Sequence, residues 1–73
     1  MKAEDVKKGM AVWVNEGMMK GKKGHVVVPN DGMDWVGVSF YDAFDKGHDI
    51  QGQLPAGSKT GRWIEPIRLD CES

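Results

Sequence analysis

Glycine constrains the fold of this chain more than any other residue. Between Gly9 and Gly61, ten glycines recur at intervals of three to ten residues in the 73-residue sequence, about twice their average frequency in proteins. A glycine inside a helix costs about 1 kcal/mol relative to alanine, whereas turns and bulges use its conformational freedom. No window shows an apolar period of 3.6 residues lasting more than two turns. We therefore expect an all-β protein of short strands.

Alternating apolar residues mark the expected strands, as in the first, where Val12 and Val14 share one face. We predict strands at residues 11–15, 25–28, 35–40 and 62–65, and a short fifth at 67–69. A single 3₁₀ turn around Pro66 is the alternative for that last region. Residues 41–60 form one long loop. These four to five short antiparallel strands suit a small barrel, because closure removes exposed strand edges.

The three tryptophans are the natural candidates for the core of such a barrel, because each aromatic side chain buries on the order of 150–250 Å². We expect Trp63 to lie inside. Trp13 and Trp35 are also expected in the core, although an exposed tryptophan beside lysines could instead stack on a nucleic-acid base.

Residues 8–38 resemble a KOW motif, the glycine-punctuated half-barrel of transcription elongation factors and some ribosomal proteins. The matching residues are Lys8-Gly9-Met10-Ala11-Val12-Trp13-Val14, then Gly17, Lys20-Gly21, Gly24, Val26 and Val36-Gly37-Val38. The chain departs from RNA-binding members of that family in one respect, because its net charge is −1 and no overall positive surplus is present.

The second half adds Gly47-His48-Asp49, Gly52, Gly61 and Arg62-Trp63-Ile64-Glu65-Pro66. With these residues the whole chain resembles the small transcription regulators of Xanthomonas-infecting phages. The resemblance implies a single SH3-like domain over residues 1–73, with residues 1–5 and 70–73 expected to be flexible. It also implies a monomer in the host bacterial cytoplasm that binds the largest subunits of host RNA polymerase, inhibits initiation and promotes antitermination.

Charge is distributed unevenly along the chain. Residues 1–30 contain six lysines and three acidic residues, whereas residues 31–73 contain four basic and eight acidic residues. Lysines gather on the first loop and aspartates on the long loop, which suggests a bipolar docking surface. The alternative is that both are ordinary solvated loops.

Met18 and Met19 are two adjacent apolar residues in a glycine-rich turn, and methionine is common at adaptable interfaces. The alternative is that one methionine folds back onto the barrel end while its neighbour stays exposed. Our predicted partner contacts are Trp13, Met18, Met19, Lys20, Lys22 and Lys23, with Asp42 and Asp45 as a secondary patch.

Motifs for chemistry are missing from the sequence. His25, His48, Asp49 and Cys71 are the only plausible metal ligands, and none has a tight ligand spacing. His48-Asp49 is better interpreted as a backbone-bonding pair that pins the long loop. Without a nucleophile or phosphate-loop motif, we expect no enzyme and no cofactor. No apolar run reaches the roughly 18 residues of a membrane span.

The alternative function is a KOW-type RNA or DNA binder that uses the lysine loop on phosphates. It predicts a steep loss of affinity with salt. The acidic second half opposes this interpretation, because it repels the nucleic-acid backbone unless it is turned away.

Overall fold

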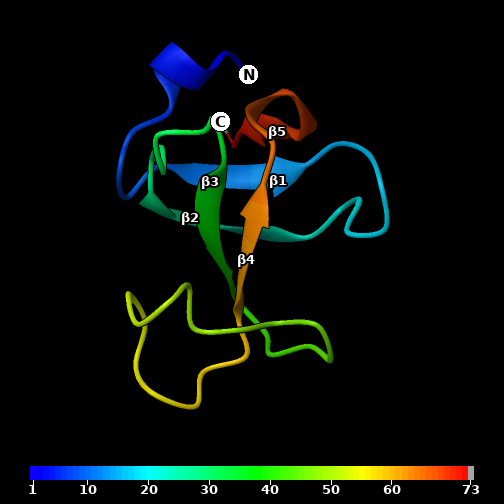
Figure 1. The fold of residues 1–73 in the computed structure, drawn as a ribbon. Coiled ribbons are helices and arrows are strands. Elements are labelled where there is room, and N and C mark those ends of the chain that lie inside the picture. Colours follow the sequence, from blue (N-terminus) through cyan, green and yellow to red (C-terminus); the bar gives the residue numbers. More distant parts are fainter. Residues whose placement is uncertain (73) are drawn as a thin grey trace.

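A computed structural model describes residues 1–72, which form five strands and two short 3₁₀ helices (Figure 1). The strands are β1 (Ala11–Val14), β2 (Lys23–Val28), β3 (Val36–Phe40), β4 (Gly61–Ile64) and β5 (Leu69–Cys71), and the 3₁₀ helices are η1 (Ala3–Asp5) and η2 (Pro66–Arg68). The all-β prediction is confirmed, as is the alternative of a 3₁₀ turn at Pro66. The fifth strand begins two residues later than predicted, because this turn occupies the preceding residues.

The strands form one antiparallel sheet in the order β4-β3-β2-β1-β5. A shift of register between Val26 and Val28 marks an irregularity in β2, of the kind that bends a sheet. Figure 1 shows β3 and β4 crossing in front of β1 and β2. The expected closure into a barrel was wrong, because β4 and β5 do not pair within residues 1–72 and remain the two edges.

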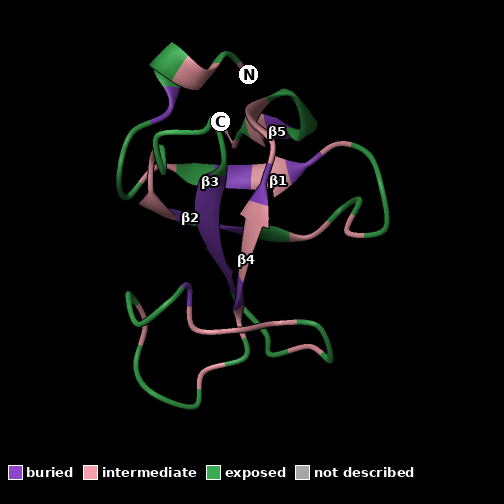
Figure 2. Ribbon diagram, in the orientation of Figure 1, coloured by how far each residue is buried: buried purple, intermediate pink, exposed green. Residues whose placement is uncertain are grey.

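Valines, not tryptophans, form most of the core, and Figure 2 shows β3 buried along its length. The buried cluster consists of Val6, Val12, Val14, Val26, Val36, Val38, Phe40, Ile64 and Leu69. Trp13 and Trp63 are half-buried and Trp35 is 40% exposed. The prediction of a tryptophan core was therefore wrong. Side chains alternate between the two faces of a strand. Trp13 therefore lies on the other face of β1 from Val12 and Val14, and Trp63 lies on the other face of β4 from Ile64.

The long loop, residues 41–60, is anchored on the second face of the sheet by Ile50. This side chain is fully buried, although its backbone has a φ of +53°, which is unusual for a β-branched residue. Its methyl and methylene groups occupy the space over Gly37 and Gly61, where a Cβ atom would lie 3.0 Å and 2.5 Å from them. The loop therefore covers β3 and β4 with a single inserted side chain.

His48 and Asp49 hold the loop backbone beside this anchor. His48 exchanges two backbone hydrogen bonds with Gly61, both 2.8 Å long. The Nδ1 atom of His48 accepts from the Ile50 N–H at 3.1 Å, and Asp49 Oδ1 accepts from the Gly52 N–H at 3.2 Å. The prediction that this pair pins the long loop is confirmed.

Both ends of the chain carry more structure than the expected flexibility of residues 1–5 and 70–73 suggests. The Met1 nitrogen donates to the carbonyls of Pro66 and Leu69 at 3.1 and 2.7 Å, and η1 lies within the first five residues. Residues 70 and 71 belong to β5, which pairs with β1. Ser73 lies outside the described residues.

Candidate protein-binding surface

Exposed apolar side chains gather around Trp35. Five large hydrophobic residues are exposed within residues 1–72, namely Met18, Met33, Trp35, Tyr41 and Ile67. All except Tyr41 border hollows that share Trp35 as a wall. We call Met18, Met33, Trp35, Trp63 and Ile67 the Trp35 surface. Since these residues come from four separate segments, only the folded chain brings them together.

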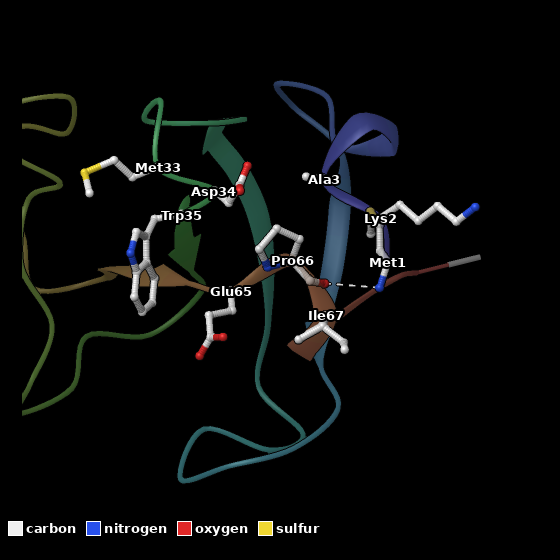
Figure 3. A pocket seen from close by; sticks show the side chains of 9 residues that line it. All are labelled: Met1, Lys2, Ala3, Met33, Asp34, Trp35, Glu65, Pro66 and Ile67. Carbon is white, nitrogen blue, oxygen red and sulfur yellow. Dashed lines mark hydrogen bonds between the residues drawn. The ribbon is translucent and has the colours of Figure 1, made fainter.

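The largest hollow is an open groove of about 650 Å³ between Trp35 and the first residues of the chain. Figure 3 shows Met33 and Trp35 on one side of it, residues 1–3 on the other, and Pro66 between them. Ile67 and Glu65 also line this groove. It is therefore built from the turn before β3, the N-terminal segment and η2.

Two smaller hollows flank Trp63 on β4. One, of about 400 Å³, lies between Trp35, Trp63 and the His48 region of the long loop. The other, of about 210 Å³, is lined by Trp63 together with Val14, Met18 and Met19. The Trp35 side chain borders all three hollows, so the apolar surface is continuous around it.

Trp35 is held by a network in the turn that precedes β3. Asp31 Oδ1 accepts hydrogen bonds from the N–H groups of Met33 and Trp35, at 2.7 and 3.2 Å. Asn30 Oδ1 accepts from Gly32 and Asp34, at 2.7 and 3.3 Å. Short polar side chains that bond the backbone in this way define Asx turns. This hydrogen-bonded turn over residues 30–35 thus positions the central residue of the surface.

Charges at the hollow bordered by Met18 are balanced. Arg68 Nε lies 3.5 Å from Glu65 Oε1 and 3.9 Å from Glu16 Oε1. Arg62 Nη1 donates to the Lys46 carbonyl at 3.2 Å. Exposed ion pairs contribute about 0–1 kcal/mol, so these contacts mainly orient the side chains. Two acidic and two basic residues border this hollow, which leaves it without net charge.

The two methionines of the first loop have different environments. Met18 is 86% exposed and borders the hollow beside Trp63. Met19 is half-buried and packs against the core cluster. This is the alternative arrangement considered for the pair, in which one methionine folds back and the other stays exposed.

The lysine loop lies against the long loop. Lys22 Nζ is 5.3 Å from the centroid of the Phe44 ring, and Lys23 Nζ is 3.4 Å from Glu72 Oε1. Among the three predicted lysines, Lys20 alone has no ion pair or ring contact within residues 1–72. Asp42 and Asp45 flank Phe44 in sequence and are both exposed.

Trp13 lies apart from the Trp35 surface. In the register of the sheet it stands opposite Lys23 on one side and Asp70 on the other. Val14, its neighbour on the other face of β1, lines the hollow next to Met18. The structure therefore separates the predicted contacts into two regions, with Met18 on one and Trp13 and Lys23 on the other.

Met33, Trp35, Trp63 and Ile67 were not among the predicted contacts, and Trp35 was expected in the core. Met33 gave a usable signal, because it is a large apolar residue within a turn of polar residues. Ile67 offered a weaker one, since it follows Pro66 on a 3₁₀ turn. Trp63 was expected in the core.

Within residues 1–72, no group of three His, Cys, Asp or Glu side chains could hold a metal ion. Cys71 is exposed and not in a disulfide. The described part of the chain contains no helix with the length and apolar character needed to cross a membrane. Comparisons with protein-family models, with curated proteins and with solved structures give no match for this chain.

Proposed function

We propose that this protein is a non-enzymatic binding module that regulates transcription by docking on host bacterial RNA polymerase through the Trp35 surface. The observation that supports a docking role is that three of the other four exposed large apolar residues border hollows lined by Trp35. Aromatic residues, methionine and arginine are enriched at protein interfaces; this surface carries tryptophan and methionine, and Arg62 and Arg68 border the hollow beside Met18.

A protein partner fits the charges better than a nucleic acid does. Lys22 is engaged by Phe44 and Lys23 by Glu72, which leaves fewer free cations on the loop that would contact phosphates. Asp31 and Asp34 flank Trp35 in the turn before β3, and their carboxylates would repel a phosphate backbone. Lys20, which has no such contact within residues 1–72, can still steer the protein toward an acidic patch on its partner.

The choice of RNA polymerase rests on the resemblance to small phage transcription regulators. A module without chemistry of its own acts by binding one conformation of its target more tightly than another. By binding the polymerase in this way, it would disfavour the initiating form and bias the elongating form against termination.

The test is retention on purified host RNA polymerase, with and without sigma factor. Replacing Trp35 by alanine should weaken binding by about 2 kcal/mol, or roughly thirtyfold in Kd, because central aromatic residues dominate interfaces. Met33→Ser tests the same surface at a position that is 78% exposed, where a substitution should cost less than about 0.5 kcal/mol of stability. Tyr41→Ala is the matched control, since Tyr41 is exposed but borders none of the hollows.

A titration of single-stranded RNA at two salt concentrations runs beside this experiment. One outcome would overturn the proposal: the protein binds RNA with a steep salt dependence but is not retained on the polymerase, and alanine at Lys20, Lys22 and Lys23 together abolishes the RNA binding. It would then favour the KOW-type nucleic-acid binder. Retention that Trp35→Ala and Met33→Ser leave unchanged would instead show that another face makes the contact.

A further inference from the structure

The outer edge of β4 presents hydrogen-bonding groups that the sheet does not use. In an antiparallel pair, successive residues direct their N–H and C=O groups alternately toward the neighbouring strand and away from it. The Phe40 N–H donates to the Thr60 carbonyl at 2.8 Å, and Gly61 bonds His48 on the other side. By the same alternation, Trp63, which stands opposite Gly37 in the register, directs its N–H and C=O away from β3.

Part of this edge is already paired by the chain itself. The His48–Gly61 bridge is antiparallel and one residue long. The segment before it turns toward Lys59 instead of continuing along β4, because Phe44 N–H donates to the Lys59 carbonyl at 3.0 Å and Gly47 N–H to the Phe44 carbonyl at 2.9 Å. The bridge therefore pairs one residue of the β4 edge with the long loop, and it stops before Trp63.

The Trp63 position is open. Neither its N–H nor its C=O has another backbone hydrogen bond within residues 1–72. Hollows lie on both sides of its side chain, and the one toward the first loop is lined by Met18, Met19 and Val14. An unpaired strand edge beside an apolar hollow has the two features that strand addition uses, with backbone bonds for affinity and a pocket for specificity.

We propose that an extended segment of the protein partner adds to the free edge of β4. Its backbone pairs with the N–H and C=O of Trp63, and one apolar side chain enters the hollow between Met18 and Trp63. The segment carries no charge at that residue, because the two acidic and two basic residues around the hollow cancel and an unpaired charge would be costly to bury there. This inference rests on the proposed function for the existence of a protein partner.

A second copy of the chain fits this edge poorly. Symmetric antiparallel pairing about Trp63 would place residue 65 of the copy opposite Gly61, whose N–H and C=O are already bonded to His48. The register cannot shift far along the chain, because Pro66 begins η2 and ends the extended backbone. A short segment of another protein needs only the free part of the edge.

Hydrogen exchange on the complex with purified host RNA polymerase core enzyme tests the inference. Exchange in a peptide covering residues 61–65 should slow by about tenfold or more on binding, because the Trp63 amide gains a partner. The exposed part of the long loop around residues 51–57 is the internal control and should not change. Met18→Ser should reduce the protection, whereas Tyr41→Ser, which replaces an exposed residue away from the hollow, should leave it intact.

The outcomes separate this inference from the proposed function. Retention on polymerase without protection at residues 61–65 would overturn strand addition and leave the docking proposal standing. Protection that appears in the free protein as its concentration rises would overturn it in favour of pairing between copies. Absence of retention would overturn both.

Discussion

Replacing Ile50 by alanine should destabilise the protein by about 2–3 kcal/mol. The side chain is fully buried, and Ile-to-Ala changes at such sites cost about 2–5 kcal/mol. Its neighbours on the sheet are Gly37 and Gly61, which have no side chains to move into the cavity. The cost should therefore lie above the lower end of that range, at about 3–4 kcal/mol before any relief of strain.

Backbone strain at Ile50 acts in the opposite direction. A β-branched residue at a φ of +53° is strained by about 1–3 kcal/mol, and alanine removes the branching. Taking about 1 kcal/mol of relief leaves the net loss of 2–3 kcal/mol. Since a domain of this length has about 4–11 kcal/mol of stability in total, the change should be easy to measure.

The assay is equilibrium unfolding in urea, followed by tryptophan fluorescence. Ile50→Val should lose about 0.5–1.5 kcal/mol, since the cavity is smaller. Gln53→Ala, at an exposed position of the same loop, should stay within about 0.5 kcal/mol of the parent. If Ile50→Ala changes the free energy of unfolding by no more than Gln53→Ala does, Ile50 does not anchor the long loop.

Three further predictions concern the sheet and the Trp35 surface. Gly24→Ala should lower the free energy of unfolding by about 3 kcal/mol or more, because its Cβ would overlap the carbonyl oxygen of Ser39 on β3; a melting temperature within a few degrees of the parent would contradict this. Met19→Ala should lower the free energy of unfolding, measured in urea, by about 1–2 kcal/mol, and Met18→Ala should lower it by less than about 0.5 kcal/mol. Equal losses would refute the inferred difference in the packing of the two methionines. Asp31→Ala removes two hydrogen bonds to the backbone and should weaken polymerase retention by loosening Trp35; unchanged retention would show that the turn does not position the surface.

Local patterns predicted the strands well. Glycine spacing and alternation located β1 to β4 to within two residues, because both features report directly on backbone conformation. The same alternation could have predicted that Trp13 lies outside the core, on the other face of β1 from Val12 and Val14. The assumption that a small barrel needs large core residues outweighed it, whereas six valines with Phe40, Ile64 and Leu69 form the buried cluster.

The candidate site was only partly predictable. Met18 was identified from its unusual place in a glycine-rich turn, but Trp35 and Trp63, which border the same hollow, lie far away in the sequence. Their proximity depends on the bend of the sheet and on η2, which no local pattern reports. Ile50 was hidden for a similar reason, because a left-handed conformation at an isoleucine is imposed by its tertiary contacts.

The pairing of β1 with β5 also governs how the chain reaches its folded state. Val12 stands opposite Cys71, so this contact closes a loop of about sixty residues, at an entropic cost on the order of 4 kcal/mol. The β1–β2 and β2–β3 hairpins need much shorter closures and can form first. Folding should therefore be limited by the late arrival of β5, on the millisecond-to-second scale of β-proteins with non-local pairing. Until then one edge of β1 remains unpaired, and that interval is when the chain is most exposed to aggregation.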